Sequence, residues 1–192
     1  HDVVDAVRRI AGQRKVGHTG TLDPMATGVL LVCLGQATRV SEYLMAGRKR
    51  YRATVVFGSE TDTYDVDGET VRSGGRTDFS RDEIEDALAP FHGRIEQMPP
   101  VYSAIKRDGR PLHQLAREAK ARAGGDPAQA PGAVVADPRP VEIYAIEIRD
   151  WTEPELVLEV SCSPGTYIRS LAYDLGHALD SSAHLGALVR LQ

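Results

Sequence analysis

Residues 141–162 limit the possible folds of this chain more than any other part of its sequence. The second half of the stretch alternates apolar and polar residues, and the apolar ones are Leu156, Leu158, Val160 and Cys162. A period of two residues is typical of a β-strand. Residues 141–148 are also largely apolar and lie close enough upstream to pair with that strand. The stretch therefore predicts a hairpin of two antiparallel strands.

The rest of the chain contains sequence patterns typical of helices and of strands. Ser80 and Glu83 form a capping box, which predicts a helix that runs through Leu88. Residues 123–140 are rich in alanine, glycine and proline, so we expect a mobile surface loop there. These patterns predict an α+β fold, in which a mixed, mostly antiparallel central sheet is flanked by helices. Further helices are expected at 2–11, 36–46, 112–122 and 168–179, and further strands at 29–34, 51–57, 101–106 and 185–191.

Composition is that of an ordinary globular protein. Apolar residues make up 42% and charged residues 26% of the 192 residues. The longest apolar run, Val29–Leu34, is too short to span a bilayer, and it follows no basic-then-apolar leader. The two cysteines, Cys33 and Cys162, match no metal-ligand spacing. We therefore expect a reduced cytoplasmic protein with no membrane association and no metal site.

Charge is distributed unevenly along the sequence. The formal net charge of −4 argues mildly against a nucleic-acid partner. Acidic residues gather at 60–69 and 78–86, whereas basic residues gather at 48–52 and 106–122. Separate basic clusters can bind phosphates while the total charge stays negative. The alternative, that each cluster is a solvated face, stays open at this point.

The segment from Gly17 to Gly28 carries the strongest candidate for chemistry. Its sequence, GHTGTLDPMATG, contains three glycines that permit sharp turns and close approach to a ligand. Pro24 biases Asp23 away from helical geometry, so this carboxylate lies on a stiff, extended loop. A rigid loop with one acid suits nucleophilic catalysis. An Asp-Pro turn without a catalytic role explains the same residues, and no Gly-Lys-Ser/Thr follows to make a phosphate-binding loop.

Four segments in the same order resemble the bacterial tRNA pseudouridine synthase B family, which modifies uridine 55 in the T-loop of tRNA. They are GHTGTLDPMATGVLLVCLGQATRV, KRYRATVVFGSETDTYDVDG, QMPPVYSAIK and CSPGTYIRSLAYDLG. The resemblance covers nearly the whole chain. It implies the pseudouridine synthase fold, the T-arm stem-loop of tRNA as the partner, and no cofactor or metal.

Both ends of the chain look abrupt. The first residues resemble the continuation of a family segment that opens with lysine, proline and glycine, and the last residues fall in an apolar strand. We expect residues 1–192 to be a catalytic domain without its N-terminal start and without the family's small C-terminal RNA-binding domain. A monomer is expected.

The resemblance implies that Asp23 is the nucleophile and that Arg169 pairs with it. A carboxylate that attacks a sugar carbon follows the logic of retaining glycosidases. Direct addition at C1′ and a route through a glycal both stay open. Independently of the resemblance, Arg169 falls in the first turn of its expected helix, where the helix dipole disfavours a cation. A nearby carboxylate would offset that cost, although a solvent-exposed arginine is the alternative.

The resemblance also implies how the base is held. Tyr51 stacks on the target uracil and assists proton removal from C5, while Tyr167 and Leu188 line the uracil pocket. Tyr51 stands among cations, which suits binding of an RNA strand. From residue type alone, Tyr51 and Leu188 are equally well explained as core residues.

Two further residues are implied in the eversion of the uridine. His18 resembles a wedge that fills the space the uridine vacates, and Asp65 takes part in the same rearrangement. Extruding a base costs a few kcal/mol, and a side chain that fills the hole offsets part of that cost. A lone histidine is more often structural or a surface residue, and this alternative stays open.

Two other functions remain possible from the sequence. An RNA-binding protein that remodels tRNA would share the basic clusters but would not exchange the C5 hydrogen of uridine. A hydrolase of glycosidic or nucleoside bonds would use Asp23 with a second acid and release free uracil. The sequence offers no clear second acid.

Overall fold

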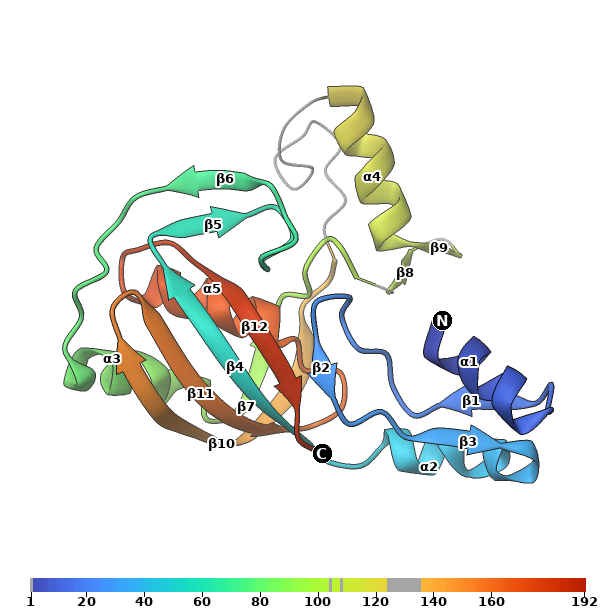
Figure 1. The fold of residues 1–192 in the computed structure, drawn as a ribbon. Helices are drawn as coiled ribbons and strands as arrows, with labels where there is room; N and C mark the ends of the chain where they lie inside the picture. Colours follow the sequence, from blue (N-terminus) through green and yellow to red (C-terminus); the bar gives the residue numbers. More distant parts are fainter. Residues whose placement is uncertain (1, 104, 108, 124–135) are drawn as a thin grey trace.

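The computed structural model describes residues 2–103, 105–107, 109–123 and 136–192, and its centre is a six-stranded sheet (Figure 1). The strands lie in the order β2-β12-β4-β11-β10-β7. β2 pairs with β12 in parallel, whereas the other neighbouring pairs are antiparallel. The predicted class, α+β with a mixed and mostly antiparallel sheet, is confirmed. The strands of this sheet are β2 (Thr27–Gly28), β4 (Lys49–Phe57), β7 (Gly93–Gln97), β10 (Arg139–Thr152), β11 (Glu155–Cys162) and β12 (Ala183–Arg190).

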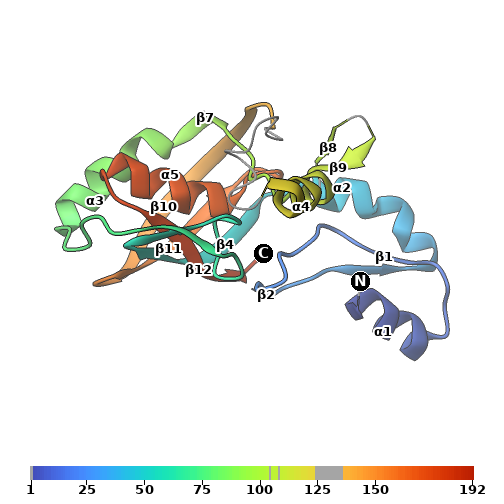
Figure 2. The same ribbon diagram turned by 90° about the horizontal axis from the view of Figure 1, so that it is seen from above.

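One face of the sheet carries the hydrophobic core. Alternate residues of β4 and β11 point to this face because side chains alternate along a strand. α3 (Arg81–Leu88) and α5 (Ile168–Ala178) lie across it (Figure 2). The fully buried members of the core include Val55, Leu156, Leu158, Leu171, Leu175 and Ile84. The predicted hairpin is present as β10 and β11, although β10 begins two residues earlier than expected.

The helices follow their local sequence signals closely. Ser80 Oγ accepts from the Glu83 amide at 3.2 Å, and Glu83 Oε2 accepts from the Ser80 amide at 2.8 Å, which confirms the capping box of α3. α1 (Asp2–Ala11), α4 (Leu112–Ala123) and α5 match their predicted ranges. Residues 36–46 form a 3-10 turn followed by a short α2 (Ser41–Met45) instead of one continuous helix. No helix among the described residues is long and apolar enough to cross a membrane.

Arginines on the opposite face of the sheet share one carboxylate. Glu159 is buried there and pairs with three of them, Arg50, Arg52 and Arg149. These hydrogen bonds, led by the one from Arg52, lower the pKa of Glu159 to about 2. Arg50 and Arg52 alternate with Tyr51 along β4, so they point away from the face that carries the tyrosine. The expectation that this basic cluster surrounds Tyr51 is therefore wrong for both.

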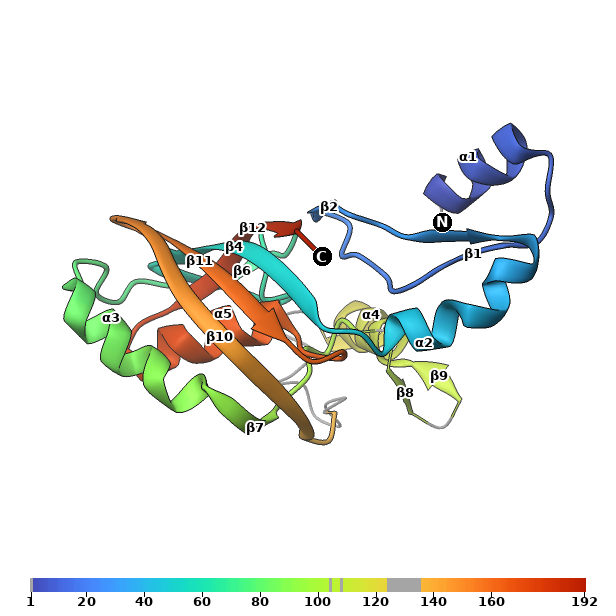
Figure 3. The same ribbon diagram turned by 90° about the horizontal axis from the view of Figure 1, so that it is seen from below.

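Residues 2–46 form a second region, called here the N-terminal lobe, beside the β2 edge of the sheet (Figures 1 and 3). β1 (Val16–His18) and β3 (Val32–Leu34) form an antiparallel ribbon in it. β2 is the part of the lobe that joins the sheet. The buried side chains of the lobe are Val4, Val16, Thr19 and Cys33.

The buried strand expected at 29–34 is wrong in length and in burial. Only β3 is extended, and the side chains of Val29 and Leu31 are 45% and 51% exposed. A two-stranded ribbon leaves one of its faces open, so an apolar run in it is not buried on both sides. The run therefore does not anchor the Asp23 loop in the core.

Among the described residues of the strand expected at 101–106, only Lys106 is in a strand, so that expectation is wrong for them, and Ala104 lies outside the described residues. The edge of the sheet is formed earlier by β7, whose inward positions include glycine and glutamine and so give a weak apolar signal. Two small pairs complete the described structure, β5 with β6 and β8 with β9, and their bounds are Ser59–Thr61, Thr70–Ser73, Lys106–Arg107 and Arg110–Pro111. Asp108 and most of the loop expected at 123–140 lie outside the described residues.

Candidate active site

The loop between β1 and β2 carries Asp23 to the junction of the lobe and the sheet. The Asp23 carbonyl accepts from the Ala26 amide at 3.0 Å, which closes the turn around Pro24. Gly28, with φ of 102°, ends this loop where β2 meets β12. A Cβ atom at Gly28 would lie 2.1 Å from the Arg190 carbonyl oxygen, so only glycine fits. The glycine brings the loop into backbone contact with the sheet.

Asp23 faces a buried guanidinium. Arg169 lies in the first turn of α5, and its Nη2 donates to Asp23 Oδ1 at 2.9 Å. The Asp23 side chain is 30% exposed, whereas that of Arg169 is 6% exposed. The predicted contact between the two residues is present. The carboxylate is thus fixed from the protein side and remains accessible to a ligand.

Arg169 binds two further loops as well as Asp23. Its guanidinium donates to the carbonyls of Thr63 and Tyr102, each at 3.1 Å. Its Nη1 also lies 3.5 Å from Oδ2 of Asp65, which is buried. Burial raises the pKa of Asp65, and the hydrogen bond from Thr63 and the charge of Arg169 oppose that rise. One cation therefore joins two carboxylates, and Asp65 belongs to the same site as Asp23 in space.

The backbone is strained beside this contact. Tyr64 has φ of 63°, in the left-handed region that is uncommon for a tyrosine. Its carbonyl accepts from the Leu185 amide at 3.0 Å, and its ring stacks on Tyr173 with centroids 4.1 Å apart. Such strain persists where surrounding contacts hold it and is frequent at functional sites. Here it falls between Thr63 and Asp65, the two residues of this loop that meet Arg169.

Two tyrosines lie near the Asp23 carboxylate. Tyr51 is on the inner face of β4, opposite Arg190 of β12, and Tyr167 is the N-cap residue of α5. Burial raises the pKa of both phenols, and the negative charge of Asp23 adds to the rise at each. Both hydroxyls are therefore protonated at neutral pH. Arg169 thus contacts the Asp23 carboxylate directly, and Tyr51 and Tyr167 lie within reach of its charge.

Leu188 is part of the hydrophobic core. It is 5% exposed and belongs to the core cluster, in which Met25 and Tyr51 are partly buried neighbours. The burial of Leu188 confirms its explanation as a core residue, and its role in a uracil pocket stays a prediction.

His18 lies at the start of the Asp23 loop. It ends β1 and is half-buried, and its Nδ1 accepts from the Gly20 amide at 3.2 Å. In a neutral ring this bond leaves the proton on Nε2. The hydrogen bond orients the imidazole relative to the loop that carries Asp23.

Arg190 is a site residue that the sequence analysis missed. It is 4% exposed, and its guanidinium donates to the carbonyls of Val29 at 2.7 Å and Gly20 at 3.3 Å. These carbonyls lie on the two sides of the Asp23 loop, so the last residue of β12 ties both to the sheet. A lone arginine within the apolar run 185–191 was the available signal.

Gln97 is the second missed residue. Its buried amide donates to the Tyr167 carbonyl at 3.0 Å and accepts from the Tyr167 amide at 2.8 Å. This paired hydrogen bond fixes the backbone at the beginning of α5, immediately before Ile168 and Arg169. A buried glutamine at the end of a strand has to satisfy both of its polar atoms, but its partner could not be read from the sequence.

Lys120, which belongs to the basic cluster at 106–122, forms ion pairs within the protein. Lys120 of α4 lies 2.7 Å from Oδ2 of Asp62 and 3.0 Å from a carboxylate oxygen of Glu69. These hydrogen bonds raise the pKa of Lys120. Asp62 directly precedes Thr63, so the contact ties α4 to the loop that meets Arg169. The described side chains include no group of three or more histidines, cysteines or carboxylates that could hold a metal ion.

Sequence comparison identifies close relatives over the whole chain. A family model described as TruB family pseudouridylate synthase (N terminal domain) matches residues 8–168. A tRNA pseudouridine synthase B from Clostridium perfringens is 44% identical over 192 residues, which are 100% of this chain and 61% of the relative. A protein of the same name from Xanthomonas axonopodis pv. citri is 46% identical over 191 residues, or 58% of its length. The chain thus spans about three fifths of the length of these curated relatives.

Solved structures share the fold. A chain in the crystal structure of a Cbf5-Nop10-Gar1 complex matches all of this chain with a TM-score of 0.71 and 30% identity, over 44% of its own length. A chain in an H/ACA RNP bound to a substrate RNA containing 2′-deoxyuridine matches with a TM-score of 0.66 and 26% identity, over 43% of its own length.

Proposed function

The chain belongs to the TruB family of pseudouridylate synthases, and we propose that it converts uridine 55 in the T-loop of tRNA to pseudouridine. The observation that carries this proposal is the partly accessible carboxylate of Asp23, held by the buried Arg169 and flanked by two protonated phenols. This group can approach a ribose from one side of a base that stacks on an aromatic ring.

The reaction is an exchange of bonds within one nucleotide. The N1–C1′ bond breaks, the uracil turns, and a C5–C1′ bond forms. The C5 hydrogen leaves as a proton, and N1 gains a proton. Asp23 acts by one of two routes. It bonds to C1′ as the N1–C1′ bond breaks and leaves as the C5–C1′ bond forms, as the nucleophile of a retaining glycosidase does. Alternatively, it takes the C2′ proton to give a glycal and returns that proton when C5 bonds to C1′.

Arg169 is proposed to position the nucleophile. Its bonds to two carbonyls and its contact with Asp65 hold the guanidinium in place, so Asp23 Oδ1 is fixed before the substrate arrives. Charged groups that are held in place before the reaction lower its activation barrier, because they do not have to reorient as the transition state forms.

Tyr51, Tyr167 and Leu188 are proposed to hold the uracil. The raised pKa of Tyr51 means that its hydroxyl is a poor base in the free enzyme. Tyr51 can accept the C5 proton only as its own proton moves on, so we assign it stacking as its first role and proton transfer as its second.

The proposed substrate is the T-arm of tRNA, with the target uridine everted into the site. His18 would fill the vacated space, and Asp65 would maintain Arg169 as the loop rearranges. The names of the relatives support tRNA as the substrate class. A similar fold in an H/ACA RNP bound to a substrate RNA supports RNA as the class of substrate.

An unmodified T-arm stem-loop incubated with the protein tests the proposal directly. Chemical mapping should detect pseudouridine at the position of uridine 55 and none in a matched RNA with cytidine there. An unmodified product after prolonged incubation, with RNA binding intact, would contradict the assignment. Tritium release from C5 distinguishes the enzyme from a protein that only remodels RNA. Free uracil among the products would indicate a hydrolase.

A further inference from the structure

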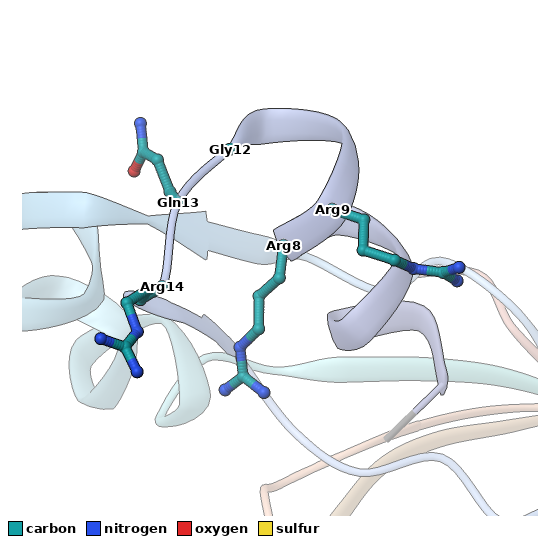
Figure 4. A pocket seen from close by; sticks show the side chains of 5 residues that line it. All are labelled: Arg8, Arg9, Gly12, Gln13 and Arg14. Carbon is teal, nitrogen blue, oxygen red and sulfur yellow. The ribbon is translucent and has the colours of Figure 1, made fainter.

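Residues 8–15 form a cationic turn at the end of the N-terminal lobe that lies away from the sheet (Figures 1 and 3). The turn joins α1 to β1, and its four cations, Arg8, Arg9, Arg14 and Lys15, are all exposed. A shallow cavity of about 390 Å³ lies among Arg8, Arg9, Gly12, Gln13 and Arg14 (Figure 4).

The charge of this region differs from that of the rest of the molecule. Residues 6–40 contain five lysines and arginines and one carboxylate, that of Asp23, in a chain whose formal net charge is −4. On the sheet, Arg50, Arg52 and Arg149 pair with Glu159, and on α3 Arg81 pairs with Glu85. Arg9, Arg14 and Lys15 make no ion pair with any residue that the structure describes. Unpaired cations gathered on one surface favour a polyanionic partner.

Local stability explains only part of this cluster. Arg8 and Arg9 lie in the last turn of α1, where cations offset the helix dipole. Arg8 also donates to Asp5 at 2.8 Å and to the Val16 carbonyl at 3.3 Å, so it has a structural role. Gly12, with φ of 60°, ends the helix before Arg14. The helix dipole therefore does not explain why Arg14 and Lys15, which follow the helix, are cationic.

The side chains point in different directions. Figure 4 shows the guanidinium groups of Arg8 and Arg14 on one side of the turn, while Arg9 extends away across the end of the helix. Groups spread in this way fit successive phosphates of a nucleic-acid backbone better than a single small anion.

We propose that Arg9, Arg14 and Lys15 bind backbone phosphates in the stem of the same RNA whose loop enters the Asp23 site. This inference rests on the proposed function. Lys15 is eight residues from Asp23, so the two are at most about 28 Å apart. Since β1 leads from the cationic turn directly into the Asp23 loop, phosphates bound at the turn would set the distance from the stem to the everted nucleotide.

The test compares three forms of the protein by their affinity for a T-arm stem-loop between about 50 and 200 mM salt. The doubly substituted Arg9→Gln/Arg14→Gln should raise Kd about tenfold at low salt and reduce the salt slope by about 2. Arg9→Lys/Arg14→Lys keeps both charges and should keep the slope. Arg81→Gln removes a paired arginine on α3 and should leave Kd within about twofold.

An unchanged Kd and slope in Arg9→Gln/Arg14→Gln overturns the inference, as does an equal loss in Arg81→Gln. Loss of binding to anionic phospholipid vesicles without loss of RNA binding also overturns it. Pseudouridine mapping on the unsubstituted protein separates the two proposals. If no pseudouridine forms while the double substitution still weakens RNA binding, the proposed function fails and the phosphate-binding surface stands.

Discussion

The sheet and the N-terminal lobe contribute to one site but are stabilised in different ways. The sheet with α3 and α5 buries a continuous hydrophobic core, whereas the lobe buries only Val4, Val16, Thr19 and Cys33 among its described residues. Arg169, Tyr51 and Leu188 come from the well-packed region, and the proposed nucleophile comes from the other.

This difference shows how a loop with little apolar burial can be placed accurately. Polar contacts from the sheet hold it: Arg169 binds the Asp23 carboxylate, and Arg190 binds carbonyls on both sides of the loop. We expect the core, together with the buried pair of Arg169 and Asp65, to determine global stability, and the contacts to the Asp23 loop to determine activity. The following predictions test that division of roles.

Asp23→Asn should have the largest effect. It retains the shape of the side chain but removes the charge needed at the ribose, so turnover should fall by roughly 10⁴-fold or more. RNA affinity should stay within about threefold. Single-turnover tritium release from C5-labelled RNA measures turnover, and a binding titration measures RNA affinity. Retained turnover would remove Asp23 from the mechanism.

Arg169→Met should affect activity and stability together. It leaves the buried Asp65 without its cation, so the free energy of unfolding should fall by about 3 kcal/mol. Turnover should fall by about 10³-fold because the nucleophile is no longer held. Arg169→Lys is the matched control, since it retains the charge but not the planar fork, and it should be intermediate. Wild-type kinetics in Arg169→Met would exclude the positioning role.

Tyr51→Phe should retain stacking and remove only the hydroxyl. If the phenol relays the C5 proton, turnover should fall by about 10²-fold, with little change in RNA affinity. Single-turnover rates of the two proteins provide the measurement. Equal rates would restrict Tyr51 to stacking.

Arg190→Met should loosen the loop and leave the sheet intact. Two hydrogen bonds from a charged donor are lost, so amide exchange in residues 19–29 should accelerate about tenfold or more. Exchange in β11 should change little, because its bonds belong to the core. Equal acceleration in both segments would show that the lobe and the sheet open as one unit.

Expectations that rested on local signals were the most accurate ones about the fold. The capping box of Ser80 and Glu83 acts over three residues and marks the start of α3 correctly. The alternation along β11 indicated its buried face because it reflects direct contact with the core. The run at 29–34 misled because an apolar pattern does not show whether a second layer covers it, and Val29 and Leu31 are exposed.

The site was less accessible to sequence reasoning because its contacts are distant along the chain. Asp23 and Arg169 are 146 residues apart, and resemblance to a family indicated their pairing where residue spacing could not. Arg190 contacts a carbonyl 161 positions away, and Gln97 contacts one 70 positions away, so neither role has a local signature. The pairing of Arg50 with Glu159 was hidden for the same reason, across 109 positions.

We propose that the Asp23 carboxylate, presented by the lobe and held by the sheet, reaches the ribose of an everted uridine. A crystal structure of the Asp23→Asn variant bound to a T-arm stem-loop tests it most directly. We expect the substituted side chain to lie about 3–3.5 Å from C1′ of the target nucleotide, with the uracil stacked on Tyr51. A target uridine still stacked within its loop, or everted away from position 23, would contradict it.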